Sequence, residues 1–293
     1  MDRVMKITKR QCLLAFFSAA IVVICVCIGV TMNLTTLADE NFDHMGIRTF
    51  CMFTVNSNIL CAAAMAMVIP YTLDGLRTHN YHMPRWIVNL VYMGVTAVAL
   101  TFLISLFILS PVKGFLLIFT GSRFFLHGVC PILSIVTFCC FINSHLIRLK
   151  ESPLALIPVF IYAVVYLVMV VFIGEAHGGW NDFYGFVTRV PLWVSLVLIM
   201  PVTYGIAMLL RLGHNRCCLR RREKDAALYR AAYTGADLRQ VVEEMARACR
   251  RELKTDSIVI PSKTIGYMIQ NSGADLDQTE LCRRYLEAFL AEA

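Results

Sequence analysis

The chain consists mainly of long apolar stretches separated by short polar connections. Each stretch has the roughly 20 apolar residues that a helix needs to cross a bilayer. We therefore predict six transmembrane helices, at residues 11–33, 51–73, 86–110, 121–143, 153–173 and 190–212. The first stretch follows a basic N-terminus, as a signal peptide would, but it is longer than a signal peptide and no small-residue cleavage site follows it. We interpret it as a membrane helix.

The remaining segment, residues 214–293, alternates apolar and charged residues with helical spacing. Its two apolar stripes are Val241, Val242, Met245, Cys249 and Leu253, and Leu281, Tyr285, Leu286, Phe289 and Leu290. This spacing is typical of amphipathic helices. We predict an all-α polytopic membrane protein, with a six-helix membrane domain at 1–213 and a small helical cytoplasmic module at 214–293 whose partner is unknown.

Composition agrees with a membrane domain. The 293 residues are 58% hydrophobic and only 16% charged, with a mean hydropathy of +0.65. Soluble domains carry about a quarter charged residues. The net charge of +7 is spread along the chain rather than gathered in one basic run, so nucleic-acid binding is not indicated.

Orientation follows from the positive charges in the connections, because cytoplasmic loops carry the excess of Lys and Arg. The N-terminus and the second and fourth connections hold 8 Lys and Arg, whereas the alternate connections hold 4. We therefore expect both termini in the cytoplasm and the protein in the cell membrane.

The twelve cysteines do not form a zinc pattern, because no CxxC pairs with a second CxxC or with an HxxxH. Several fall inside apolar stretches, where Cys behaves as a small hydrophobic residue. Cys217 and Cys218 follow the last membrane stretch, where palmitoylation occurs in some organisms, and we interpret them as unmodified thiols. No metal or cofactor is expected.

Polar side chains inside two predicted membrane helices mark a candidate site, since such residues cost about 2.5–3.5 kcal/mol near the bilayer centre. The second helix opens with a cluster that contains Thr54, Asn56 and Asn58, and the fourth carries Arg123 and His127. Both helices enter from the outer side, which places Thr54 and His127 at a similar depth, roughly 5–10 Å below the boundary. We expect the two side chains to meet.

The outer connection between the fifth and sixth helices adds further polar and aromatic residues. They are Glu175, His177, Trp180, Asn181, Asp182 and Tyr184. An interfacial aromatic belt explains Trp180 and Tyr184. We expect the acids and the histidine to support the site, with Asp182 or Glu175 orienting the His127 ring.

A threonine hydroxyl needs an adjacent base in order to act as a nucleophile, and histidine is the most common base. Thr54 and His127 supply these two groups, and Asn56, Asn58 or the backbone of the second helix could donate to an oxyanion. The ordinary structural alternative is that Thr54 bonds its own helix and His127 a neighbouring one.

Three motifs occur in a set order along the six-helix chain. They are Phe53-Thr54-Val55-Asn56-Ser57-Asn58, Leu126-His127-Gly128-Val129-Cys130-Pro131 and Gly179-Trp180-Asn181-Asp182-Phe183-Tyr184. In these motifs, over about residues 10–212, the chain resembles the family of androgen-induced and androgen-dependent TFPI-regulating proteins and their bacterial six-helix relatives. The resemblance implies an intramembrane hydrolase of fatty acid esters, with Thr54 as nucleophile and His127 as the second essential residue. Unlike the animal proteins, this chain has no hydroxyl residues directly after the histidine, so the substrate stays open.

Two other functions are compatible with the same residues. A non-catalytic lipid or small-molecule binding protein, or a carrier, would use the same polar cluster as a pocket. A zinc-dependent membrane hydrolase would need His127, His177 and either His44 or Asp182 as ligands, although no two of these have a local metal-binding spacing. The leading hypothesis is a threonine hydrolase that takes a lipid or amphiphilic ester from the membrane.

Overall fold

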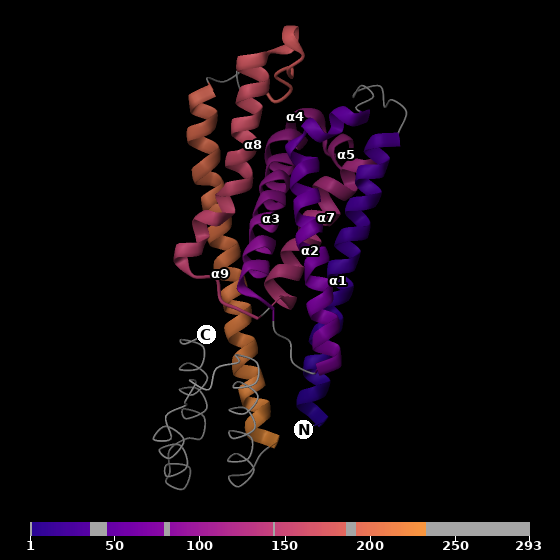
Figure 1. The fold of residues 1–293 in the computed structure, drawn as a ribbon, viewed down its shortest axis with the longest axis vertical. Coiled ribbons are helices and arrows are strands. Elements are labelled where there is room, and N and C mark those ends of the chain that lie inside the picture. The colour runs from indigo at the N-terminus through magenta and orange to yellow at the C-terminus, as the bar shows by residue number, and fades with distance from the viewer. Residues whose placement is uncertain (1, 36–45, 79–82, 143, 186–191, 233–293) are drawn as a thin grey trace. The chain divides into compact units, whose positions relative to one another are not determined.

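The computed structural model describes residues 2–35, 46–78, 83–142, 144–185 and 192–232, and the regular secondary structure in these ranges is entirely helical. Six stretches in them are long and apolar enough to cross a membrane. These spans 1 to 6 are Lys9–Thr35, Phe53–Arg77, Arg85–Lys113, Gly121–Phe141, Leu149–Ile173 and Val197–Arg220. The prediction of an all-α membrane protein with six membrane helices is therefore confirmed (Figure 1).

Three of the spans are regular α-helices and three combine short helical segments. Span 1 lies in α1 (Asp2–Thr35), span 2 in α2 (Phe53–Thr78) and span 6 in α9 (Leu192–Ala232). Span 3 is built from α3 (Arg85–Ile104), the π-helix η2 (Ser105–Leu109) and α4 (Ser110–Lys113). Span 4 is built from α6 (Gly121–Arg123), the π-helix η3 (Phe124–Val129), α7 (Cys130–Val136) and the π-helix η4 (Thr137–Phe141). Span 5 is built from the 3-10 helix η5 (Leu149–Leu156), α8 (Ile157–Leu167) and the π-helix η6 (Val168–Ile173).

Short helices occupy the connections that the structure describes. The 3-10 helix η1 (Gly46–Cys51) precedes α2, and α5 (Phe115–Ile118) lies between spans 3 and 4. The 3-10 helix η7 (Glu175–His177) follows span 5. Because η1 takes Cys51, the second membrane helix begins two residues later than the sequence predicted.

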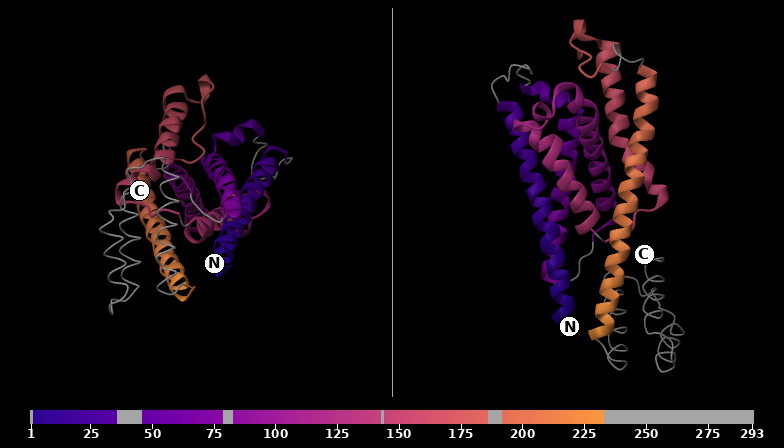
Figure 2. Two further views of the ribbon diagram at one scale, coloured as in Figure 1. Left: turned by 60° about the horizontal axis from the view of Figure 1, so that its bottom comes forward. Right: turned by 180° about the vertical axis from the view of Figure 1, so that it is seen from behind.

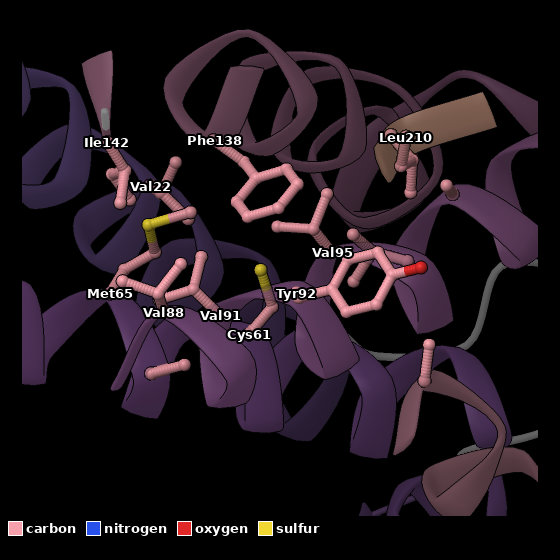
Figure 3. Packing of buried hydrophobic residues seen from close by; sticks show 14 of the residues in the cluster. Val22, Cys61, Met65, Val88, Val91, Tyr92, Val95, Phe138, Ile142 and Leu210 are labelled. Carbon is pink, nitrogen blue, oxygen red and sulfur yellow. The ribbon is translucent and has the colours of Figure 1, made fainter. Parts of the chain in front are cut away.

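The core of residues 8–218 forms around α3, which is apolar on every side. Within residues 8–218, α1 and α2 lie on one side of α3, and α8 and α9 lie on the other (Figures 1 and 2). The buried face of α3 includes Val88, Val91, Tyr92 and Val95, which pack with Met65 and Phe138 from spans 2 and 4 (Figure 3). A helix that is apolar all round is stable only when neighbours or lipid cover it, so α3 takes the central position.

Two contacts show how closely the neighbours approach α3. A Cβ on Gly94 would lie 2.9 Å from the Cα of Cys61 in α2, so the absence of a side chain lets these backbones meet. The Tyr92 hydroxyl donates to the Ala207 carbonyl of α9 at 2.8 Å. The bond gives the buried Tyr92 hydroxyl a hydrogen-bond partner, without which its burial would cost free energy.

Span 6 differs from its predicted position at 190–212, because α9 continues through residue 213 without a break. A buried stripe with helical spacing explains the difference: Thr203, Ala207, Leu210, His214 and Cys218 all face the bundle. Charged residues such as Arg216 and Arg220 occupy other faces of the same helix. They lower the average hydropathy of this segment, so the prediction ended the membrane helix too early.

His214, near the end of span 6, lies inside the bundle although the sequence places it on the cytoplasmic side of the predicted membrane helix. The side chain is fully buried. Nδ1 lies 2.9 Å from the Phe138 carbonyl oxygen, Nε2 lies 2.8 Å from that of His145, and the ring stacks on Phe138 at 4.3 Å between centroids. A neutral imidazole has one N–H to donate to a carbonyl, and the Cys218 thiol, 3.4 Å from Nε2, can donate to the other nitrogen.

The connection between spans 4 and 5 is fastened to α9 by further side chains. Asn215 accepts the Ile147 N–H at 2.9 Å and donates to the Ile147 carbonyl at 3.0 Å, and Arg211 donates to the same carbonyl at 3.1 Å. The start of span 5 is held by Glu151, which pairs with Arg85 at 2.6 Å and accepts the Arg148 N–H at 2.6 Å.

The chain divides into two compact units, one formed by Thr8–Cys218 and the other by Met1–Ile7 with Leu219–Ala293. The described part of the second unit is helical, as the ends of α1 and α9. Both apolar stripes of the predicted C-terminal module, Val241–Leu253 and Leu281–Leu290, lie outside the described residues. The helical module therefore stays a prediction.

Replacing Glu151 by Gln should lower the free energy of unfolding by about 1–3 kcal/mol, because a charge-assisted hydrogen bond to Arg85 becomes a neutral one. Thermal unfolding of the purified protein in detergent micelles measures this change. The exposed neighbour Lys150 provides the control, as Lys150→Gln should leave the melting temperature almost unchanged. Equal shifts for both variants would contradict a role for the ion pair.

Candidate functional site

The candidate site lies at the end of the bundle where spans 2 and 4 begin, which we call the Thr54 end. Span 1 ends there as well, because Ser122 at the start of span 4 donates to Asn33 near the end of span 1. The connection after span 5 also reaches it through Tyr184. Polar residues from four parts of the chain therefore converge where the sequence predicted a site.

Tyr184 caps the N-terminus of α2 and contacts Thr54 directly. The Phe53 N–H donates to Tyr184 Oη at 3.0 Å, and both the N–H and the hydroxyl of Thr54 hydrogen-bond to the same phenol. The first N–H groups of a helix have no partner within the helix, and the phenol oxygen supplies one. Burial raises the pKa of Tyr184 to about 12, so the phenol keeps its proton at neutral pH.

Thr54 differs from several other threonines in the spans. Thr72, Thr96 and Thr203 donate to carbonyls of their own helices, at 2.7, 2.8 and 2.6 Å. This self-bonding is the ordinary structural alternative for a membrane threonine. The hydroxyl of Thr54 instead meets a side chain from another element, Tyr184, which favours a role beyond helix self-capping.

Asn58 joins the turn of Thr54 to the element that carries His127. Its Nδ2 donates to the Thr54 carbonyl at 2.7 Å and to the Leu126 carbonyl at 3.0 Å. In a π-helix, the carbonyl of residue 126 would accept the N–H of residue 131. Residue 131 is a proline and has no N–H, so the Leu126 carbonyl can accept the bond from Asn58. Two carbonyl partners identify the donor nitrogen of the amide, and the other atom, Oδ1, is buried without a hydrogen-bond partner.

His127 lies in the π-helix η3, a type of turn that is frequent at functional sites. The side chain is half-buried, its Nδ1 is buried without a hydrogen-bond partner, and the ring hydrogen-bonds to the backbone of Ile118. Nδ1 is thus not bonded to Thr54 in this structure, although Asn58 ties the backbones of Thr54 and Leu126 together. The two predicted catalytic residues lie on contacting elements but share no hydrogen bond.

Packing around η3 is close on the side of α1. A Cβ on Gly29 would lie 2.8 Å from Cδ2 of Leu126, so only glycine allows this approach. Gly128, within η3, faces Phe119, which follows α5. A Cβ on Gly128 would lie 3.4 Å from the Phe119 ring. Glycines on both elements therefore help to set the position of the turn that holds His127.

The predicted supporting residues of the outer connection fall into two groups. Glu175, His177 and Asn181 are exposed, and the structure does not bring them to Thr54. Asp182 is half-buried and its Oδ1 accepts the Tyr166 hydroxyl at 2.7 Å, so it pairs with span 5 rather than with His127. Trp180 is half-buried, with its ring centroid 6.4 Å from Tyr162.

The two remaining predicted residues, Asn56 and Arg123, lie near the starts of spans 2 and 4. Asn56 donates to the Phe50 carbonyl at 2.8 Å and so fastens α2 to the preceding turn η1. Arg123 is half-buried and lies one turn before His127, at the end of α6. Its spacing from His127 is as the sequence predicted.

Two tyrosines of span 5 that were not predicted from the sequence line the site. The Tyr162 hydroxyl donates to the Cys51 carbonyl at 2.6 Å, and Tyr162 packs on Phe53 at 5.0 Å between centroids. Tyr166 holds Asp182 and packs on Tyr184 at 5.6 Å. Tyr162 and Tyr166 are four residues apart, hence on one helix face, and this spacing was the available signal.

No group of three or more His, Cys, Asp or Glu side chains among the described residues could hold a metal ion. His177, one ligand of the zinc alternative, is exposed on η7, and His44 lies outside the described residues. The structure therefore adds no support to the zinc alternative.

Asn58→Asp should destabilise the protein far more than Asn58→Ala, because a carboxylate would face two carbonyl oxygens where an amide now donates to both. We expect a loss of about 1–3 kcal/mol for alanine and loss of most folded protein for aspartate. Size-exclusion chromatography and thermal unfolding in detergent measure both effects. Asn56→Ala serves as the control, with a smaller shift, since Asn56 bonds only the adjacent turn. Equal stability of the Asp and Ala variants would contradict the assigned amide orientation.

Comparisons with known proteins give no relative to set beside this geometry: no protein-family model matches the chain, and no curated protein or solved structure matches it significantly. The resemblance in the three motifs therefore stays a prediction. Thr54, Asn58 and Tyr184 form a polar cluster at one end of the six-span bundle, and His127 lies on the contacting element η3.

Proposed function

We propose that this protein is an intramembrane hydrolase that cleaves a lipid-like ester, with Thr54 as nucleophile and His127 as base. The observation that carries the proposal is the bond pair of Asn58, which links the Thr54 carbonyl to the carbonyl next to His127. The unpartnered Nδ1 of His127 also supports it, because a general base needs a free lone pair. The resemblance to intramembrane threonine hydrolases points to the same two residues.

In the proposed reaction, the Thr54 hydroxyl attacks the ester carbonyl while His127 takes its proton. The carbon–oxygen bond to the alcohol then breaks, the alcohol leaves with that proton, and the acyl group stays on Thr54. Water, activated by the same imidazole, adds to the acyl group and releases the carboxylic acid. The N–H groups of Phe53 and Thr54, which now bond Tyr184, are the proposed donors to the oxyanion.

The proposal includes an orientation, with both termini in the cytoplasm of a cell membrane and the Thr54 end on the outer side. The excess of Lys and Arg in alternate connections supports it. The substrate would then enter from the outer leaflet, and the C-terminal segment would meet its partner in the cytoplasm.

A second function, a non-catalytic lipid-binding protein or carrier, rests on a different observation. The Thr54 hydroxyl is engaged by Tyr184 and not by His127, so in this state the nucleophile is not activated. Polar groups that converge among apolar walls are also what a binding site needs. An intact lipid that copurifies with the protein and is not hydrolysed over time would favour this function.

Thr54→Ala should abolish labelling of the protein by a fluorophosphonate probe in membranes, because the probe reacts with an activated hydroxyl. Thr54→Ser should keep labelling, and His127→Ala should slow it on the order of 10²–10⁴-fold. In-gel fluorescence of the labelled protein measures all three. The control variants Ser57→Ala, Cys51→Ala and Cys130→Ala should label like the wild type. Undiminished labelling of the Thr54→Ala protein would remove the hydrolase proposal.

The proposed orientation predicts that a C-terminal green fluorescent protein is fluorescent and that a C-terminal alkaline phosphatase is inactive, because only the former folds in the cytoplasm. The inverse pattern is expected for fusions truncated after Gly178, which follows span 5. Active phosphatase at the C-terminus would refute the orientation and leave the site chemistry untouched.

A further inference from the structure

We propose that residues 181–185 form a latch over Thr54, that Tyr184 is its closing group, and that substrate reaches Thr54 only when the latch swings away. The latch is defined by contacts in this structure, and its part in substrate access rests on the proposed function. In this proposal Tyr184 is a positioning residue, which keeps Thr54 covered when no substrate is bound.

The segment before the latch is a compact turn fixed to the end of span 5. The Gly174 and Trp180 N–H groups both donate to the Met169 carbonyl, at 3.2 and 3.0 Å. A Cβ on Gly179 would lie 2.2 Å from that same oxygen, so only glycine fits the turn. Residues 174–180 therefore form an anchored base from which the latch extends.

The latch contacts the bundle through Asp182, Phe183 and Tyr184. Asn181, at its start, is exposed, and Gly185, at its end, has φ +71°, a backbone conformation that glycine adopts at little cost. Polar contacts join it to the bundle: the Phe53 N–H donates to Tyr184 Oη, and the Tyr166 hydroxyl donates to the Asp182 carboxylate and accepts the Tyr184 N–H at 3.3 Å. The rings of Phe183 and Tyr184 also pack on Tyr166, at 5.2 and 5.6 Å between centroids. Local opening would separate the latch from Tyr166 and from the start of α2 together, between the fixed base and Gly185.

The latch controls the atoms that the proposed reaction needs. Tyr184 Oη bonds the Thr54 hydroxyl and the Phe53 N–H, which are the nucleophile and an oxyanion donor. While these bonds persist, the ester carbonyl has no donor and the Thr54 hydroxyl does not reach His127. Opening frees both groups at once, and His127 Nδ1, which has no hydrogen-bond partner in this structure, is the proposed acceptor of the Thr54 proton.

The test uses a thiol in place of the covered hydroxyl. In a Thr54→Cys background, the alkylation rate of residue 54 by a membrane-impermeant maleimide reports how often the latch opens. Adding Tyr184→Phe removes the phenol's hydrogen bonds but keeps the ring, and the rate should rise roughly 5- to 30-fold. Asp182→Asn weakens the bond to the Tyr166 hydroxyl and should give a smaller rise. Peptide-resolved mass spectrometry separates residue 54 from the natural cysteines.

Tyr71→Phe is the matched control, because Tyr71 lies further along α2 and outside the latch; its rate should stay at the background value. Unchanged rates in both latch variants would overturn the latch. Fluorophosphonate labelling of Thr54 in the otherwise wild-type protein separates the two proposals. Faster alkylation in the latch variants without fluorophosphonate labelling of Thr54 would support the latch and contradict the hydrolase proposal. Labelling of Thr54 with unchanged alkylation rates would support the hydrolase proposal and contradict the latch.

Discussion

Backbone groups that have no helical partner must be satisfied from within this protein, because hydrocarbon offers neither donors nor acceptors. This requirement explains most of the polar side chains inside the bundle. Asn58 donates to the Leu126 carbonyl that Pro131 leaves open, Tyr184 accepts the first N–H of α2, and His214 meets the Phe138 carbonyl in span 4. Each of these bonds also joins two elements that are distant in the sequence. The polar residues thus determine which helices contact each other at depths where apolar packing alone would allow several arrangements.

The same requirement is met differently at the two ends of the bundle. At the end that holds His214, side chains of α9 bond the backbone of the span 4–5 connection at several points, and Glu151 adds an ion pair to Arg85. At the Thr54 end, the cover is a short segment attached through Tyr184 and Asp182. In the proposed function this cover has to move to admit a ligand, and segments that bind ligands belong to the least stable parts of a fold.

The proposed hydrolysis and the alternative binding function would use the same residues, and they differ in the hydrogen-bond partner of the Thr54 hydroxyl. If Tyr184 keeps the Thr54 hydroxyl, the cluster is a polar binding site; if His127 takes it, the cluster has the nucleophile and base of an esterase. The buried acceptor atoms Asn58 Oδ1 and His127 Nδ1 lie on contacting elements at this end and have no hydrogen-bond partner from the protein. Buried acceptors of this kind are costly unless a donor reaches them. Other buried atoms, such as Thr137 Oγ1, also lack a partner, so the proposed site rests on the convergence of Thr54, Asn58 and Tyr184 with η3.

The sequence by itself determined the six membrane helices and the polar residues within them, because apolar length and the cost of polar groups in lipid are properties of the chain read in one dimension. It placed Thr54 and His127 at one end for the same reason. Only the tertiary structure decided that Thr54 meets Tyr184, that Asp182 pairs with Tyr166, and that His214 is buried. These outcomes depend on π-helical turns, on close approaches at glycine and on the rotation of each helix about its axis. Such features depend on which neighbouring element supplies the hydrogen-bond partner of each polar group. The local pattern of residues along the chain does not contain that information.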